Sequence, residues 1–275
     1  MMRRRRRPLR HLTFALGAAI TGLLLATALL SLAWTPADPL AMSIAGRLTG
    51  PSAAHPFGTD QYGRDLLSRV MRGAVTSIAV GVIAVGIGAA TGMMAGMLSG
   101  YVGGWCDEVL MRVIDAVQGF PAILSALLFS AVFGPGIVVS MVAVGIAFVP
   151  AFARITRGSF LELRAREFVV AAQALGARDR RLVVRHILPN TLAPLIVQAT
   201  TSFPVAILAE AGLAYLGLGT QPPHPSWGLM LKDAQNFLAM SPGYALFPGG
   251  AIALTVLGLN LVGDGLRDLL DPRTS

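Results

Sequence analysis

Long apolar runs separated by short polar segments make up most of this chain. A membrane-spanning helix needs about 20 mainly apolar residues, and six runs come near that length. They lie at residues 12–34, 75–99, 116–133, 137–153, 193–216 and 245–262. The third and fourth runs are joined by Phe-Gly-Pro-Gly at 133–136, which predicts a hairpin turn. The pattern predicts an all-α integral membrane protein with six transmembrane helices.

The composition agrees with a surface that faces lipid. Hydrophobic residues make up 54% of the chain and charged residues 13%, whereas soluble domains carry about 25% charged residues. The net charge is +8, but nearly all the basic residues are arginines that cluster between the apolar runs, which argues against a nucleic-acid-binding face. The single cysteine, Cys106, excludes an internal disulfide framework.

The first apolar run follows a basic tail at residues 1–11. A cleaved signal peptide has an apolar centre of about 7–15 residues, and the run at 12–34 is longer. The length favours an uncleaved first helix, with a signal peptide as the alternative.

Basic residues also predict the orientation, because cytoplasmic segments carry an excess of Lys and Arg. If the N-terminus is cytoplasmic, the inner segments hold most of the 22 basic residues. Both termini, at 1–11 and 263–275, and the loop at 154–192 are therefore predicted to be cytoplasmic. The segment at 35–74 is predicted to be extracytoplasmic, and the tail at 263–275 to form a short polar helix.

Four glycines recur every fourth residue in the second run: Gly88, Gly92, Gly96 and Gly100. This spacing places them on one side of a helix and lets another helix approach closely. The alternatives are a tight contact, within the chain or between subunits, and ordinary bundle packing.

The cytoplasmic loop contains a segment at 166–190 in which Gly176 separates two short helical patterns. Asp179 is positioned to cap the second helix, and Pro189 is predicted to end it. Apolar residues lie on one side and arginines on the other. Two interpretations stay open from periodicity alone: an interfacial helix whose arginines meet anionic lipid, or a docking element for a cytoplasmic partner.

This segment resembles the cytoplasmic loop shared by the membrane subunits of bacterial ABC importers. The family pattern is Glu-Ala-Ala, three residues, Gly, nine residues, and Ile-x-Leu-Pro. Identity and spacing match at Ala171, Ala172, Gly176, Leu188 and Pro189. The glutamate position holds Val170 and the isoleucine position holds His186. Glu167, one turn before Val170, is the candidate to replace the family's glutamate.

Four longer stretches, at 55–74, 174–199, 207–228 and 246–272, resemble the dipeptide/oligopeptide/nickel permease branch, and within it the second, shorter permease subunit. The resemblance implies the type-1 ABC transmembrane fold, a second homologous permease, two ATPase subunits and an extracytoplasmic binding protein. ATP and magnesium would belong to the ATPases. In agreement, the sequence lacks G-x-x-x-x-G-K-[ST], and its sole lysine, Lys232, is on the predicted outer side. The chain is thus expected to be a transport subunit without its own ATPase site or cofactor.

Two groups of candidate site residues follow. The ATPase-docking candidates are Glu167, Ala171, Ala172, Gly176, Arg178, Asp179, His186, Leu188 and Pro189. The candidates for the pathway or the external interface are Asp60, Arg64, Asp65, Glu210, Gln221 and Trp227.

The outer segment at 58–65 has two interpretations. It is either a turn capped by Thr59 or Asp60, with Arg64 and Asp65 on the surface, or part of the surface that faces the binding protein. In the loop at 221–228 three prolines limit the backbone, and Trp227 is typical of a membrane interface; the loop is either purely structural or a partner contact.

Glu210 is the only acidic residue deep in a predicted span. A carboxylate there is costly and usually faces protein or water. It is either a hydrogen-bonded packing group or a pathway residue that meets the substrate's amine. His55 and His224 are too few to form a metal site, so none is expected.

The alternative function is a secondary transporter driven by an ion gradient. It predicts ionisable residues within the spans and an inverted repeat, and Glu210 alone fits. The residues do not distinguish dipeptides, oligopeptides, nickel chelates and other small solutes as substrates.

Overall fold

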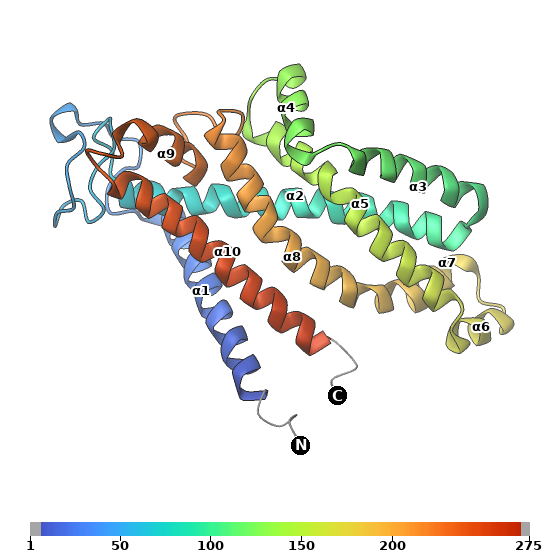
Figure 1. The fold of residues 1–275 in the computed structure, drawn as a ribbon. Helices are drawn as coiled ribbons and strands as arrows, with labels where there is room; N and C mark the ends of the chain where they lie inside the picture. The colour runs from blue at the N-terminus through green and yellow to red at the C-terminus, as the bar shows by residue number, and fades with distance from the viewer. Residues whose placement is uncertain (1–6, 271–275) are drawn as a thin grey trace.

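The computed structural model describes residues 7–270, with side chains from Leu12 to Leu269. This part of the chain is helical apart from loops and one isolated β-bridge between Thr59 and Asp65, which confirms the all-α prediction. The α-helices are α1 (Arg7–Ala33), α2 (Leu66–Val102), α3 (Gly104–Gly119), α4 (Ala122–Phe133), α5 (Ile137–Arg164), α6 (Glu167–Ala174), α7 (Asp179–Arg181), α8 (Leu188–Tyr215), α9 (Trp227–Ala234) and α10 (Gly243–Leu270) (Figure 1). Most of the basic tail and the last five residues lie outside the described part.

Five helical stretches are long and apolar enough to cross a membrane: Leu12–Ala33, α2, α5, Asp179–Tyr215 and α10. The predicted third span at 116–133 is not one helix. It is broken between α3 and α4, whose axes differ by 87°. The break falls at Pro121, which lacks an amide hydrogen and forces the preceding Phe120 into an extended conformation (φ −92°, ψ 127°). The bent pair supplies the sixth span only if both helices are counted together.

Several helices also run past their predicted ends. α2 begins at Leu66 and α5 continues to Arg164. α10 continues to Leu270, so the polar helix predicted at the C-terminal tail is the last part of α10. Apolar runs mark the thickness of a bilayer, whereas helical hydrogen bonding continues into the flanking polar residues.

The glycine stripe of α2 is the contact with α5. A Cβ added at Gly96 would lie 2.2 Å from the carbonyl oxygen of Ala153, and one at Gly92 would lie 2.6 Å from that of Val149. Backbones this close exclude any larger side chain. The close contact is therefore made within the chain.

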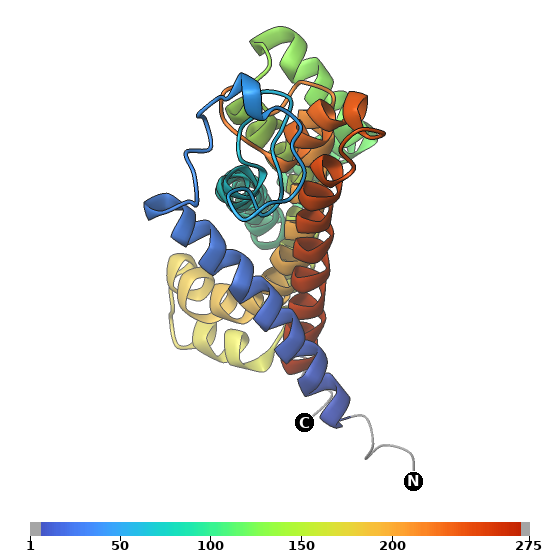
Figure 2. The same cartoon turned by 90° about the vertical axis from the view of Figure 1, so that its left-hand side faces the viewer.

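The bundle has two contrasting ends, named here by their short helices. At the α9 end the loops of residues 34–65 and 216–242 gather, and at the α6 end lie α6, α7 and the ends of α2 and α5 (Figure 1). α1 lies beside α10 in both views (Figures 1 and 2), with Phe14 packed on Gly265 and Ile20 on Gly258.

Candidate functional site

The α6–α7 segment, residues 165–190, turns sharply at Gly176. Gly176 has φ +83°, and its N–H donates to the carbonyl oxygen of Gln173 at 2.9 Å. Ala177 N–H then donates to the Ala172 carbonyl oxygen at 3.1 Å, which completes the helix end. A Cβ at Gly176 would meet nothing within 4 Å. The left-handed backbone, and not a lack of space, therefore favours glycine here.

One face of this segment is fixed to the bundle. Val169, Leu182 and Ile187 are buried together with Phe160 of α5. The opposite face of α6 is exposed and includes Glu167 and Ala171. Leu175, beside the turn, is 89% exposed. Phe168 and Val170 of α6 are exposed as well, and such a group of exposed apolar side chains is typical of a contact surface for another protein.

The second helical pattern differs from the prediction. Arg178, not Asp179, is the N-cap residue of α7, and its side chain makes no capping bond. Asp179 instead accepts a hydrogen bond from the Tyr101 hydroxyl at 2.6 Å, which ties the segment to the end of α2. α7 has three residues and continues through a π-helix, Leu182–Ile187, into α8.

The prediction that Pro189 ends a helix is wrong. Pro189 lies in the first turn of α8. The widened π turn directly before it makes bonds to residue i−5, such as Leu188 N–H to the Val183 carbonyl oxygen. A proline is tolerated at this junction because its missing N–H falls beside the widened turn. His186 is half-buried, and its carbonyl oxygen accepts from the Asn190 side chain at 2.7 Å.

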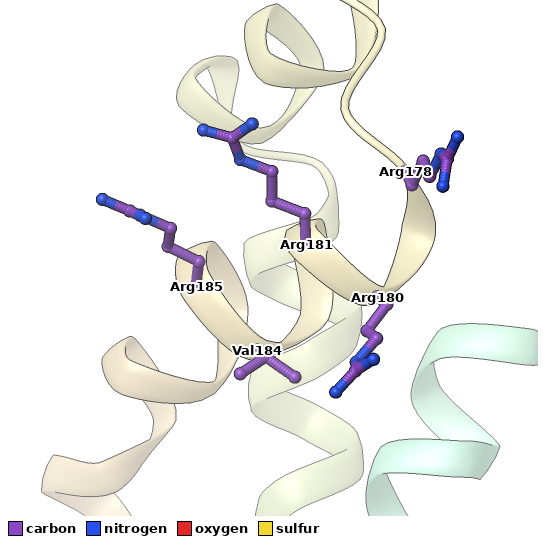
Figure 3. A pocket seen from close by; sticks show the side chains of 5 residues that line it. All are labelled: Arg178, Arg180, Arg181, Val184 and Arg185. Carbon is purple, nitrogen blue, oxygen red and sulfur yellow. The ribbon is translucent and has the colours of Figure 1, made fainter.

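Arginines dominate the exposed side of the junction. Figure 3 shows Arg181 and Arg185 projecting on one side of the helix and Arg180 on the other. With Arg178 and Val184 they line an open pocket of about 330 Å³. Within residues 7–270, no ion pair involves these four arginines.

The α9 end has a buried polar cluster around Asp60. Asp60 is 0% exposed, and its Oδ1 accepts from the N–H groups of Tyr62 and Arg64 at 2.8 and 2.9 Å. Its Oδ2 accepts from Arg64 Nε at 2.6 Å and lies 3.4 Å from Nε of the buried Arg69. The prediction that Arg64 lies on the surface is wrong, because its guanidinium is needed to neutralise this carboxylate.

Asp65, also predicted on the surface, is buried and is the N-cap of α2 in place of Thr59 or Asp60. Its Oδ2 accepts from the backbone N–H and the hydroxyl of Ser68, each at 2.7 Å. Its Oδ1 lies 2.9 Å from Nδ1 of His55. His55 thus has a structural partner, and the described residues contain no group of three potential metal ligands.

Trp227 is 1% exposed, so its indole ring is enclosed by protein and does not face lipid. Its Nε1 donates to the Val70 carbonyl oxygen at 2.9 Å, and its ring fills the space beside Gly73. The side chain anchors α9 on α2. Gln221 is exposed and donates to the carbonyl oxygens of Gly217 and Gly219, both at 3.0 Å, at the end of α8.

Glu210 is fully buried on α8, where its Oε1 accepts from the Thr220 hydroxyl at 3.3 Å. It therefore contacts the loop between α8 and α9, while its buried Oε2 has no hydrogen-bond partner among the described residues.

Sequence reasoning missed two sets of residues. Tyr244 of α10 is buried at the α9 end and donates to Gln61 at 2.5 Å. Burial raises the pKa of the nearby Asp233, while Arg64 and Arg69 act in the opposite direction. The other set consists of ion pairs between α3 and α5, Asp107–Arg157 and Asp115–Arg154. No local pattern marks either set, because the partners lie far apart in the sequence.

Residues 92–275 match the family described as "Binding-protein-dependent transport system inner membrane component". The chain belongs to this family.

Its relatives are permeases. It is 44% identical over 260 residues to the dipeptide transport system permease protein DppC of Alkalihalophilus pseudofirmus, with 93% of this chain and 86% of that one covered. It is 47% identical over 224 residues to the glutathione transport system permease protein GsiD of Escherichia coli, covering 82% and 74%. In fold it is similar to a chain of the MetNI methionine ABC transporter in an inward-facing conformation (TM-score 0.61, 16% identity, 74% of this chain and 96% of that chain).

The chain is therefore a multi-pass permease subunit of an ABC importer, and its role is transport. The family match confirms the resemblance found in the motifs and disfavours the ion-gradient-driven alternative.

Proposed function

We propose that this chain forms one half of the translocation pathway of an ATP-driven importer for peptides or a related small solute. The partners are a second, homologous permease, two ATPase subunits that bind ATP and magnesium, an extracytoplasmic binding protein and the surrounding lipid. The peptide assignment rests on the relatives, whose names refer to dipeptide and glutathione transport.

In this proposal the α6 end lies in the cytoplasm and the α9 end outside. The described part of the α6 end is rich in arginine, as expected for a cytoplasmic side. Both termini are cytoplasmic in the same orientation, in the inner membrane of a bacterium.

The observation that carries the proposal is the α6–α7 segment itself. It exposes Leu175 beside the turn at Gly176, while Val169, Leu182 and Ile187 pack it on α5 and α8. A subunit that binds the exposed face of the segment would therefore move α5 and α8 together. Closure of an ATPase pair on ATP would rock these helices as a rigid body and open the pathway to the other side.

Residue roles follow from the geometry. Ala171, Glu167 and Leu175 face the ATPase, and Ala172 and Leu188 pack the segment on the bundle. Gly176 shapes the turn. The α9-end residues Asp60, Arg64 and Asp65 hold the external loops in the shape that meets the binding protein, rather than touching it themselves.

Gly176→Arg tests the docking role, with Gly103→Arg as the matched control. Both glycines lie at the α6 end, have positive φ (+83° and +73°) and have no neighbour within 4 Å of an added Cβ. Affinity purification of the Gly176→Arg chain is expected to recover the second permease without ATPase subunits, while Gly103→Arg recovers both. Equal recovery of ATPases by both variants would refute the docking role.

A further inference from the structure

The arginines that follow the turn at Gly176 form a positive surface that the docking face of α6 does not need. Arg178, Arg180, Arg181 and Arg185 are all exposed, and with Val184 they line the open pocket described above. Arg181 and Arg185 are four residues apart and project on the same side of the helix (Figure 3). In the described part of the chain, none of the four is in an ion pair, so their charge is available to an anion from outside the chain.

The exposed side chains of α6 are of a different kind. Phe168, Val170 and Leu175 are exposed and apolar, and the charged residue of this helix, Glu167, is acidic. Apolar side chains of this kind suit the surface of another protein, whereas neighbouring guanidinium groups suit an anion with several oxygens. The two surfaces of the α6–α7 segment therefore call for different ligands.

The arginines also lie at the start of a helical stretch that can cross a membrane. This stretch, Asp179–Tyr215, has 37 residues, which at about 1.5 Å per residue is at most about 55 Å long. The hydrocarbon core of a bilayer is about 30 Å thick, so a large part of the stretch lies outside it. All the arginines of the stretch fall between residues 180 and 185, which assigns this end to the polar headgroup region or beyond.

Exposed apolar side chains follow the arginines along the same helix. Leu192 and Ile196 are 45% and 46% exposed and come 7 and 11 residues after Arg185. This spacing returns them to the side of the helix that carries Arg181 and Arg185. Basic residues followed by apolar ones along one exposed face are typical of a helix at a membrane surface, where the charged groups meet headgroups and the apolar groups meet acyl chains. The pattern favours a lipid over a soluble anion or an acidic protein.

We propose that Arg181 and Arg185 bind the phosphate of an anionic lipid in the cytoplasmic leaflet, with its acyl chains along Leu192 and Ile196. The planar guanidinium groups donate paired hydrogen bonds to the phosphate oxygens. The bound lipid holds the segment at the membrane surface and leaves the exposed face of α6 open to the ATPase. Only the choice of leaflet rests on the proposed function.

Lipid binding to the purified complete transporter in detergent tests the site, with a fluorescent phosphatidylglycerol as the probe. A double variant, Arg181→Gln with Arg185→Gln, is compared with Arg112→Gln combined with Arg267→Gln, which removes two exposed arginines from α3 and α10. The first variant is expected to bind the probe about tenfold more weakly than wild type, because each arginine adds attraction to an anionic lipid. The control is expected to bind as wild type does. Equal binding by the two double variants would overturn the proposal.

Competition against the same probe tests the ligand class. Unlabelled phosphatidylglycerol is expected to displace the probe at about tenfold lower concentration than phosphatidylcholine with the same acyl chains, because phosphatidylcholine carries no net charge. Equal displacement by the two lipids would contradict a site for anionic headgroups. Displacement by inorganic phosphate alone at a similar concentration would assign the arginines to a soluble anion instead.

Affinity purification separates this inference from the docking role. The variant that lacks Arg181 and Arg185 is expected to recover the ATPase subunits as wild type does. Loss of the ATPases with unchanged lipid binding would mean that the arginines bind protein, which would overturn the lipid site. A wild-type chain that recovers no ATPase would contradict the proposed function and would leave the lipid measurement unaffected.

Discussion

The two ends of the molecule use the same residue types in opposite ways. At the α9 end, the charged groups of Asp60, Arg64 and Arg69 are buried and neutralise one another. At the α6 end, Arg181 and Arg185 are exposed and Leu175 stands in solvent. An end whose charges are satisfied internally is built to hold a shape, whereas an end with unsatisfied charges and apolar surface is built to receive another molecule.

The largest effect is expected from breaking the α9-end cluster. Asp60→Ala leaves two guanidinium groups buried without their carboxylate, and removing one partner of a buried pair costs about 3–5 kcal/mol. The thermal unfolding midpoint of the purified chain in detergent is expected to fall sharply. Asp38→Ala, at an exposed position in the same loop region, is the control and is expected to leave the midpoint nearly unchanged. A small shift for Asp60→Ala would show that the cluster does not hold this end together.

At the α6 end the matching change is expected to affect binding and not folding. Leu175→Asp removes an exposed apolar contact and is expected to weaken ATPase association by about 2 kcal/mol, roughly 30-fold, with an unchanged unfolding midpoint. Val102→Asp, at a side chain 60% exposed at the end of α2, is the control for added charge. Titration of the ATPase subunit onto each variant measures the difference; equal weakening by both variants would argue against a specific contact.

A smaller effect is expected at the bond between Tyr101 and Asp179. Tyr101→Phe removes one hydrogen bond at the α6 end, worth about 0.5–1.5 kcal/mol. Hydrogen exchange is expected to accelerate in the residues around Gly176 and to stay unchanged around Trp227. Acceleration at both ends would mean that the segment is not an independent unit.

The smallest effect is expected from single arginines. Arg181→Gln is expected to weaken ATPase or lipid association by less than about 1 kcal/mol, because exposed ion pairs contribute little. The difference from wild type is expected to vanish at high salt, where charges are screened. A salt-independent loss would indicate a buried contact instead.

The sequence predicted the regions that repeat a simple period and missed those formed by distant partners. The apolar runs located the spans, and the spacing of Gly88 to Gly100 located a close helix contact. The start of α2 was missed because Ser68, Arg69 and Arg72 resemble a polar loop until their partners are known. Gln61 and Tyr244 are 183 residues apart, so no local pattern joins them.

The α6–α7 segment shows the same limit within one motif. Spacing identified Ala172 and Gly176, whose roles are local. Asp179 was misassigned as a cap because its partner, Tyr101, comes from another helix. The break at Pro121 was overlooked because the flanking residues are apolar enough to hide it in a hydropathy pattern.

The most direct test of the account is site-specific crosslinking from the two ends in the native membrane. A photoreactive group is placed at Leu175 in one chain and at Ile44, 84% exposed at the α9 end, in another. The account predicts a crosslink to a P-loop ATPase from position 175 and none from position 44. An ATPase crosslink from position 44, or its absence from position 175, would contradict the assignment of the α6 end as the docking site.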